Sequence, residues 1–257
     1  MSAQVNDFVV FHRVRFANPL NGVGHPLPGP KTAEAWRFYP AAVLGENGLP
    51  TFVSDEWGGF GIYRTQEAAE EVFMNPEEHL GFLDETVEAF HALAVPYAHH
   101  GKVDWRGEFL ENATFAVAPS DPGGPLMVLT SAGYDNPGPA EVPRIARFYG
   151  AVIEVRDYYS TLPGNIRGAV YSGGRVDGRS GMTVTLWGSD EAMRTAAYRP
   201  GHHRTQMDYQ RQVGHFDFSS FTRARILATK GSWDGGDPVQ EIAPPGAVSP
   251  EAGTAAV

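Results

Sequence analysis

The histidines are the residues of this sequence best suited to chemistry. The chain has nine histidines and no cysteine, so imidazole and carboxylate groups are the metal ligands that it offers. No His-x-x-x-His or His-Glu-x-x-His spacing occurs, and His99-His100 and His202-His203 are adjacent residues, whose side chains diverge on a strand or a helix. Neither pair suits the chelation of one metal ion, whereas a single axial imidazole is enough to hold haem. The histidines therefore favour haem over a mononuclear non-haem metal.

His203 has the position that suits such a ligand best. An alternating, strand-like run ends at Trp187, Ser189 can cap the helix that follows, and Pro200-Gly201 interrupts that helix before the chain restarts at His202-His203. A ring held at this restart can point into a cavity lined by the preceding strand. We take His203 as the candidate iron ligand and His202 as the alternative. A solvated histidine at a helix start is the competing interpretation.

Further residues are candidates for the same pocket. We expect Trp187 and Tyr198 to shape the pocket and, with His202, to form the catalytic set. Trp187 also fits an ordinary core aromatic. Arg223 and Arg225 share one face of a predicted strand, and Arg223 is a candidate partner for a haem propionate because guanidinium pairs well with carboxylate. A surface arginine on a half-buried strand is equally compatible with this pattern.

Composition limits the class of protein and its partners. The net charge is −10 and the twenty Lys and Arg residues are scattered, so nucleic acid is not an expected partner. No apolar run approaches the roughly 20 residues that cross a bilayer, and Met1-Ser2-Ala3-Gln4 lacks the features of a signal peptide. We expect a cytoplasmic protein, monomeric or homodimeric, whose partners are a small-molecule substrate and an electron donor.

The chain contains a weak internal repeat. An offset of 124 residues places Tyr63 on Trp187, Thr65 on Ser189, Pro76 on Pro200 and His79 on His203, and an offset of 128 places Trp105 on Trp233 and Gly107 on Gly235. We expect residues 1–107 and 125–235 to form two related units, with a linker at 108–124 and a disordered tail at 236–257. His79 is then the counterpart of His203 in the first unit.

Each unit is expected to be ferredoxin-like, with the order βαββαβ and a split second helix. In the first unit the apolar pattern predicts helices over Ala33–Leu44 and Glu77–Phe90, and in the second unit Arg144–Tyr159 is the clearest helix of the chain. One such unit leaves an apolar sheet face uncovered, so two units in tandem can pack face to face. The sequence therefore predicts an α+β fold in which tandem ferredoxin-like units pack face to face as a barrel within one chain. We expect haem to lie between the two sheets.

Four stretches of the C-terminal half carry a family resemblance. They are Thr185-Leu186-Trp187-Gly188-Ser189, Tyr198-Arg199-x-Gly201-x-His203-Arg204, Phe221-x-Arg223-x-Arg225-Ile226-Leu227 and Gly231-Ser232-Trp233-x-Gly235. Together they resemble the C-terminal half of spheroidene monooxygenase and its relatives, which are haem-dependent carotenoid oxygenases. Where that family carries Trp-Phe-x-Glu before the last strand, this chain has His215-Phe216-Asp217-Phe218, a departure that leaves the substrate and the acid–base partner open.

The resemblance implies a function as well as a fold. It implies a dimeric α+β barrel with haem b, an axial histidine from a helix beside the sheet, which suits His203, and a monooxygenase acting on an apolar or aromatic small molecule in secondary metabolism. That fold class also holds haem-degrading monooxygenases, chlorite dismutase and aldoxime dehydratase, so a haem-dependent dehydratase or bond-forming enzyme is one alternative. A cofactor-free barrel that binds or cyclises a polyketide-like ligand, with His79 or His203 as general base, is another.

Overall fold

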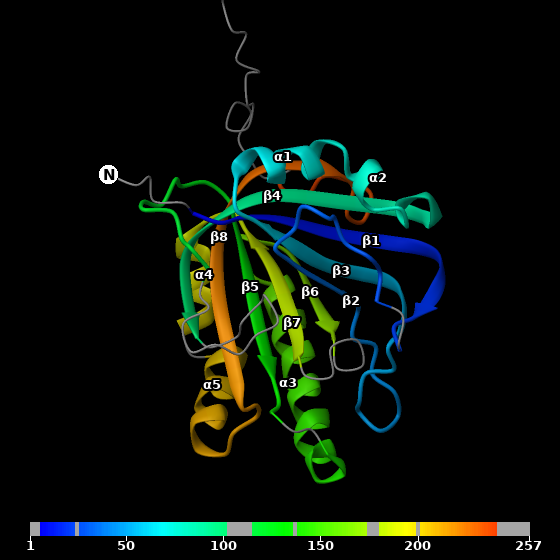
Figure 1. The fold of residues 1–257 in the computed structure, drawn as a ribbon. Helices are drawn as coiled ribbons and strands as arrows, with labels where there is room; N and C mark the ends of the chain where they lie inside the picture. Colours follow the sequence, from blue (N-terminus) through cyan, green and yellow to red (C-terminus); the bar gives the residue numbers. More distant parts are fainter. Residues whose placement is uncertain are drawn as a thin grey trace, which may run out of the picture.

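One antiparallel sheet organises the protein. The structure is a computed structural model that describes residues 6–23, 26–101, 115–135, 138–173, 180–198 and 201–240. Its strands are β1 (Phe8–Asn21), β2 (Ala35–Pro40), β3 (Val53–Tyr63), β4 (Thr86–Gly101), β5 (Leu126–Gly133), β6 (Asn165–Ser172), β7 (Ser180–Trp187) and β8 (Phe218–Gly231). In the described part of the chain these strands form one sheet in the order β2-β3-β1-β4-β8-β5-β7-β6 (Figure 1).

The sheet consists of two halves with the same strand order. The first half is β2-β3-β1-β4, the second half is β6-β7-β5-β8, and antiparallel pairing of β4 with β8 joins them. At the two outer edges, Ala41 forms a bridge with Tyr171, and the Ala42 amide donates to the Val170 carbonyl at 2.8 Å. The sheet therefore curves back on itself as a barrel. This confirms the predicted α+β fold, in which two related units in tandem form a barrel within one chain.

Apolar side chains fill the inside of the barrel. Because side chains alternate along a strand, every second residue of each half points inward. Buried inward residues from both halves form one cluster, which includes Phe11, Phe60, Phe90, Met127, Leu129, Tyr171, Val184, Leu186, Ile226 and Trp233. A porphyrin between the two half-sheets would need the space that these side chains occupy. The predicted haem position between the sheets is therefore wrong.

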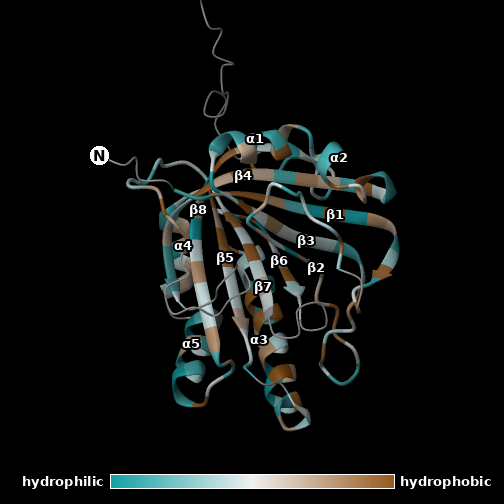
Figure 2. Ribbon diagram, in the orientation of Figure 1, coloured by the Kyte–Doolittle hydropathy of each residue, from teal (hydrophilic) through white to brown (hydrophobic). Residues whose placement is uncertain are grey.

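The helices lie on the outside of the barrel. They are α1 (Gln66–Met74), α2 (Pro76–His79), α3 (Val142–Ser160), α4 (Asp190–Tyr198) and α5 (His202–Gln212). Figure 1 shows α1 and α2 over the first half, whereas α3, α4 and α5 lie beside the second half. In Figure 2, α5 is mainly hydrophilic, while the neighbouring strands carry many hydrophobic residues. Among the described helices, none combines the length and apolar character that crossing a membrane requires.

The predicted helix caps are confirmed in both halves. The Thr65 hydroxyl accepts a hydrogen bond from the Ala68 amide at 3.2 Å, and the Ser189 hydroxyl accepts one from the Ala192 amide at 3.1 Å. Each cap satisfies an amide at a helix start that has no partner within its own helix. The two caps begin α1 and α4 directly after β3 and β7, as the repeat predicts.

The helix predicted over Ala33–Leu44 is wrong, because this segment contains strand β2. Ala35 and Tyr39 are buried toward the inside, while Trp36 and Phe38 stack on each other outside with ring centroids 5.2 Å apart. The apolar residues therefore follow the two-residue period of a strand, which a single short apolar run does not distinguish from a helical period. The first half consequently has no counterpart of α3 in the described residues.

The helix predicted over Glu77–Phe90 is also wrong for most of its length. Helix α2 ends at His79, a single 3₁₀ turn follows at Leu83–Glu85, and β4 begins at Thr86. Val87 stays exposed and Phe90 is buried inside the barrel. Pairing with β1 and β8 thus overrides the local helical pattern. In the second half, by contrast, the helix predicted over Arg144–Tyr159 is confirmed as α3.

Two predicted irregular segments are described only in part. Within the predicted linker, the Asp7 carboxylate accepts a hydrogen bond from the Ala116 amide at 2.9 Å, whereas residues 108–114 lie outside the described residues. Within the predicted tail, Val239 is buried and the Asp237 carboxylate accepts a hydrogen bond from the Thr229 hydroxyl at 2.5 Å. The rest of the tail, 241–257, also lies outside the described residues, so the domain boundaries stay predictions.

Candidate functional site

His203 lies in the first turn of α5 and is held by one hydrogen bond. Its Nδ1 atom lies 2.8 Å from the Ala197 carbonyl oxygen, near the end of α4. A carbonyl only accepts, so Nδ1 carries the proton and Nε2 presents a lone pair. Burial lowers the pKa of His203, although the bond to Ala197 raises it, so the imidazole is neutral at neutral pH. Within the described residues Nε2 has no hydrogen-bond partner.

Aromatic contacts hold the His203 ring against the end of α3. Tyr159 lies between two rings, with its centroid 5.8 Å from that of His203 and 5.2 Å from that of Trp187. Trp187 is 1% exposed, and its indole donates to the Thr185 hydroxyl at 2.9 Å. Trp187 therefore supports the His203 ring through Tyr159, a residue that the sequence did not single out.

The other two members of the predicted catalytic set are less closely tied to this group. Tyr198, the last residue of α4, is 62% exposed. His202 begins α5, but its side chain lies outside the described part of the structure. Their catalytic roles stay predictions, as does that of Trp187.

Arg223 lies on the outer face of β8, where its guanidinium already has a partner. It pairs with Asp190 at 3.2 Å and lies 5.2 Å from the centre of the Tyr97 ring. The Tyr97 hydroxyl donates to the same carboxylate at 2.6 Å, and Arg225 lies over the same ring and pairs with Asp121. This network ties β4 and β8 to the start of α4. The role of Arg223 as a propionate partner stays a prediction, and Tyr97 and Asp190 are tertiary partners that local spacing did not reveal.

The sheet face on the helix side of the second half is partly open. Because Phe8 pairs with Tyr63 and Leu126 with Trp187, the repeat aligns β1 with β5. The cross-strand pair Thr130–Phe221 then corresponds to His12–His91 of the first half. Phe221 is 37% exposed and Thr130 is half-buried, whereas His12 and His91 are 0% and 3% exposed. Val128 and Thr183, beside Thr130, are also half-buried. The second half thus keeps accessible surface where the first half is closed.

The closed face of the first half contains a buried histidine pair. The Nδ1 atoms of His12 and His91 lie 2.7 Å apart, so one ring donates and the other accepts. Burial lowers the pKa of both rings, that of His91 to about 4 and that of His12 well below its ordinary value, with a contribution from the neighbouring His91. Trp36 packs on His12 with ring centroids 5.6 Å apart. The sequence signal for this pair is His12 within an otherwise apolar alternation from Phe8 to Phe16.

His79, the counterpart of His203, has a different environment. It ends the short helix α2, its side chain is 21% exposed, and its Nε2 atom lies 3.7 Å from a Glu71 carboxylate oxygen. No backbone carbonyl holds its ring in the way that Ala197 holds His203 among the contacts of the described residues. The repeat placed both histidines correctly in the second helical segment of each half, but only His203 has its Nδ1 atom fixed.

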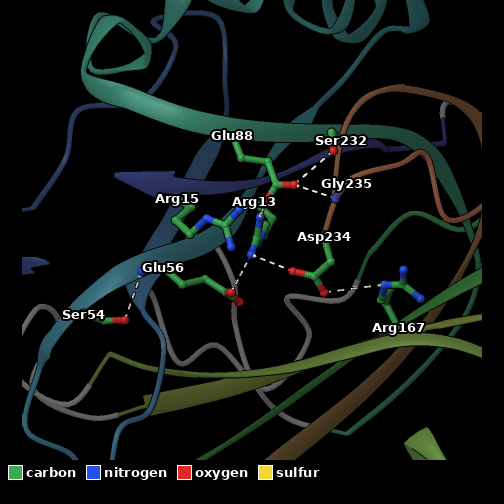
Figure 3. A network of polar contacts seen from close by, with 9 residues as sticks. All are labelled: Arg13, Arg15, Ser54, Glu56, Glu88, Arg167, Ser232, Asp234 and Gly235. Carbon is green, nitrogen blue, oxygen red and sulfur yellow. Dashed lines mark hydrogen bonds and ion pairs between the residues drawn. The ribbon is translucent and has the colours of Figure 1, made fainter. Parts of the chain in front are cut away.

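An ion-pair network centres on Arg13, on the inward side of β1 (Figure 3). Arg13 is 1% exposed, pairs with Glu56 at 2.7 Å and with Glu88, and lies 5.6 Å from the centre of the Trp233 ring. Burial raises the pKa of Glu88, but hydrogen bonds from the Gly235 amide, Arg13 and Ser232 lower it to about 2. The network joins β1, β3 and β4 to the turn after β8. No local pattern in the sequence singled out these residues.

The described residues offer few other arrangements that could hold a ligand. Within the described ranges, no three His, Asp or Glu side chains gather as metal-ion ligands. A cavity of about 540 Å³ opens at the start of α3, lined by Asp135, Glu141, Arg144 and Asp217. Arg144 pairs with Glu141 and Asp217, so three of the four charged groups of this cavity pair with one another. His203 is therefore the best-prepared ligand in the described residues.

Comparison with known proteins identifies the fold. No protein-family model matches the chain, and no curated protein matches its sequence. An aldoxime dehydratase has a TM-score of 0.52 at 10% identity, over 88% of this chain and 83% of its own. A second one, solved with butyraldoxime, has a TM-score of 0.51 at 9% identity, over 88% of this chain and 81% of its own.

A smaller protein covers only part of the fold. SnoaB from Streptomyces nogalater, a cofactor-independent oxygenase, has a TM-score of 0.28 at 16% identity, over 43% of this chain and 93% of its own. The fold assignment rests on the two aldoxime dehydratases, which span both halves of the barrel. The chain is thus an α+β barrel protein with the overall fold of these solved structures.

Proposed function

We propose that this protein is a haem b-dependent oxidoreductase, a monooxygenase of an apolar or aromatic small molecule, with His203 as the iron ligand. The observation that carries the proposal is the Nδ1 bond from His203 to the Ala197 carbonyl, which leaves a neutral Nε2 atom without a partner in the described residues. Metal-bound imidazoles use this arrangement, because a carbonyl partner fixes the tautomer and the ring orientation.

The partly open sheet face supports a planar group beside α5. Val128, Thr130 and Thr183 are half-buried and Phe221 is 37% exposed, although helices lie on this side of the second half. These side chains are uncharged and small or aromatic, which suits the face of a porphyrin and an apolar substrate. The equivalent face of the first half is filled by the His12–His91 pair. These features support the proposal of one haem, held in the second half.

Residues of this chain would prepare the site in defined ways. Tyr159 packs on the His203 ring and fixes its tilt, while Trp187 supports Tyr159 from the core. Asp190, held by Tyr97 and Arg223, fixes the start of α4 and through it the Ala197 carbonyl at the other end of that helix. When bound, haem would supply oxygen activation, which no side chain of this chain provides. The resemblance to spheroidene monooxygenase supports this chemistry over the Lewis-acid alternative.

Haem reconstitution tests the ligand. Adding haem to the purified chain is expected to give a Soret band that saturates at one haem per chain. The variant His203→Ala should bind haem at least about tenfold more weakly, which corresponds to about 1.4 kcal/mol. His79→Ala is the matched control, because His79 occupies the equivalent position of the first half and should leave the titration unchanged. A titration of His203→Ala that matches the wild type would overturn the assignment.

Turnover conditions test the reaction class. A monooxygenase consumes O₂ and a reductant with each product, whereas a dehydratase or bond-forming enzyme needs no stoichiometric O₂. Candidate apolar and aromatic compounds should be incubated with the haem-loaded chain, with and without O₂ and with and without ascorbate as the reductant. Product formation that depends on both would support the proposal. Product formation that is undiminished without O₂ would replace it with the haem-dependent dehydratase.

A further inference from the structure

A second polar group lies inside the barrel, far from the Arg13 network. On β4, His99 lies nine residues beyond Phe90, the residue opposite Arg13. At a rise of about 3.3 Å per residue, this separates the two regions by roughly 30 Å. His99 Nδ1 lies 2.8 Å from the Thr222 hydroxyl, and Ser220 follows two residues away on the same inward face of β8. We call His99, Thr222 and Ser220 the inner polar wall.

Two atoms of the inner polar wall have unmet hydrogen bonds. The Ser220 hydroxyl and the His99 Nε2 atom are buried and have no hydrogen-bond partner among the residues that the structure describes. Ser220 and Thr222 are both 0% exposed. An unmet buried polar atom costs about 1–3 kcal/mol, so such atoms are normally paired with protein, water or ligand. Burial also lowers the pKa of His99, which keeps its ring neutral at neutral pH. The wall therefore offers hydrogen bonds to a neutral partner.

The repeat shows that smaller side chains accompany these unmet bonds. The cross-strand pair Ser131–Ser220 occupies the position that Arg13–Phe90 occupies at the other end of the barrel. Two serines thus replace an arginine and a phenylalanine, and both serines are fully buried. The neighbouring inward residues are apolar, and Phe115 packs on His99 with ring centroids 5.5 Å apart. An occupant of this region must be largely apolar with one polar end.

We propose that the inner polar wall binds a neutral, mainly apolar molecule that carries a hydroxyl group, such as a phenol. The ligand hydroxyl would pair with Ser220 and His99 Nε2, and its ring would lie among the apolar inward residues. This site is separate from the face of His203, because Thr222 and Ser220 point inward while Phe221 and Arg223 lie on the outer face of the same strand. It does not depend on haem.

Paired probes test this site. The full-length chain without added haem is titrated with 2-naphthol, which is neutral at pH 7, and with naphthalene, which lacks the hydroxyl. The wild type is expected to bind 2-naphthol at least tenfold more tightly than naphthalene. Ser220→Ala and His99→Phe should each reduce this preference to less than threefold while the affinity for naphthalene stays within twofold.

The chain offers a matched control for each variant. Ser219 and His100 are the sequence neighbours of Ser220 and His99 and lie on the opposite face of their strands. Ser219→Ala and His100→Phe should therefore keep the full preference for 2-naphthol. Absence of binding to the wild type, equal affinities for the two probes, or a preference that survives in both wall variants would overturn the proposal.

Discussion

The two halves of the barrel share a strand order but differ at equivalent positions. On the outer face, the first half has the buried pair His12–His91 where the second half has Thr130 and the partly exposed Phe221. On the inner face, the first half has Arg13 opposite Phe90 where the second half has two serines. In both comparisons a polar side chain of the first half, His12 or Arg13, has a partner, and the equivalent position of the second half carries a smaller hydroxyl residue, Thr130 or Ser131.

This difference separates structural roles from binding roles. A repeat gives two sites with the same backbone, and only one of them needs to stay accessible for a ligand. The first half fills its site with paired polar groups and aromatic rings, which stabilises the fold. The second half leaves surface and unmet hydrogen bonds at the matching positions. The same contrast distinguishes His79 from His203, whose Nδ1 atom alone is fixed by a backbone carbonyl.

Breaking the Arg13 network should have the largest effect on stability. Arg13→Met removes the partner of the Glu56 and Glu88 carboxylates at a position that is 1% exposed. Removing one member of a buried ion pair costs about 3–5 kcal/mol, since the other charge stays buried. Urea denaturation monitored by circular dichroism measures this loss. Arg15→Met is the control, because Arg15 also pairs with Glu88 but is 41% exposed, and it should cost under about 1 kcal/mol. Equal losses would show that burial does not set the difference.

The His12–His91 pair should make stability depend on pH in a defined window. Both rings have a pKa below the ordinary value of 6.5, that of His91 at about 4, so the unfolded chain binds more protons than the folded chain between these values. The pair should therefore make its full contribution to the free energy of unfolding above pH 6.5, and this contribution should decrease as the pH drops toward 4. The groups facing the pair include Glu77, which opposes the lowering, and Lys230, which favours it.

A double variant isolates this contribution. His12→Leu/His91→Leu should reduce the fall in unfolding free energy between pH 6.5 and 4, because these two rings no longer take up protons there. The exposed His100 gives the control, since His100→Leu should leave the slope unchanged. A slope in the double variant as steep as in the wild type would mean that other groups cause the acid sensitivity.

Adding a single methyl group should test the close packing of the first half. A Cβ atom at Gly58 would lie 2.2 Å from Cζ of Tyr171, which belongs to the second half. Gly58→Ala should therefore destabilise the protein by about 1–3 kcal/mol, the usual cost of overpacking. Gly81→Ala is the control, because a Cβ atom there meets nothing within 4 Å. Thermal unfolding of both variants provides the comparison, and similar melting temperatures would contradict the close contact between halves.

The smallest expected effects concern the two helix caps. Thr65→Ala and Ser189→Ala each remove a side-chain acceptor from the first turn of a helix and should each cost about 1 kcal/mol. Ser189→Ala should also weaken haem binding, because α4 carries the Ala197 carbonyl that holds His203, whereas Thr65→Ala should not. A haem titration of both variants measures this, and equal haem affinities would separate α4 from the site.

Local sequence patterns predicted much of the secondary structure, but they did not predict the contacts between residues far apart in the sequence. The alternation up to Trp187, the cap at Ser189 and the break before His202 predicted β7, α4 and α5 directly. The segment around Trp36 was misassigned because its apolar spacing suits both a helix and a strand, and only pairing with β3 decides between them. Pairings such as Tyr97 with Asp190, or His12 with His91, join residues 93 and 79 positions apart, so no local spacing could reveal them.

The location of the predicted haem changed for the same reason. The sequence placed His203 on the correct helix, but it could not show that the space between the half-sheets is filled or that the helix lies on the outer face. Those facts depend on how the inward residues of eight described strands pack together. His203 stays the candidate ligand after this correction, but the proposed haem now lies on the outer face of the sheet and not between the half-sheets.

We propose that His203, and not its counterpart His79, holds an iron porphyrin. The absorption spectrum of haem-loaded His203→Gly and His79→Gly, each with and without free imidazole, tests this ligand assignment. We expect His203→Gly to lose the spectrum of imidazole-ligated haem and to regain it when imidazole is added, while His79→Gly matches the wild type throughout. A wild-type spectrum for His203→Gly without imidazole would show that His203 is not the iron ligand.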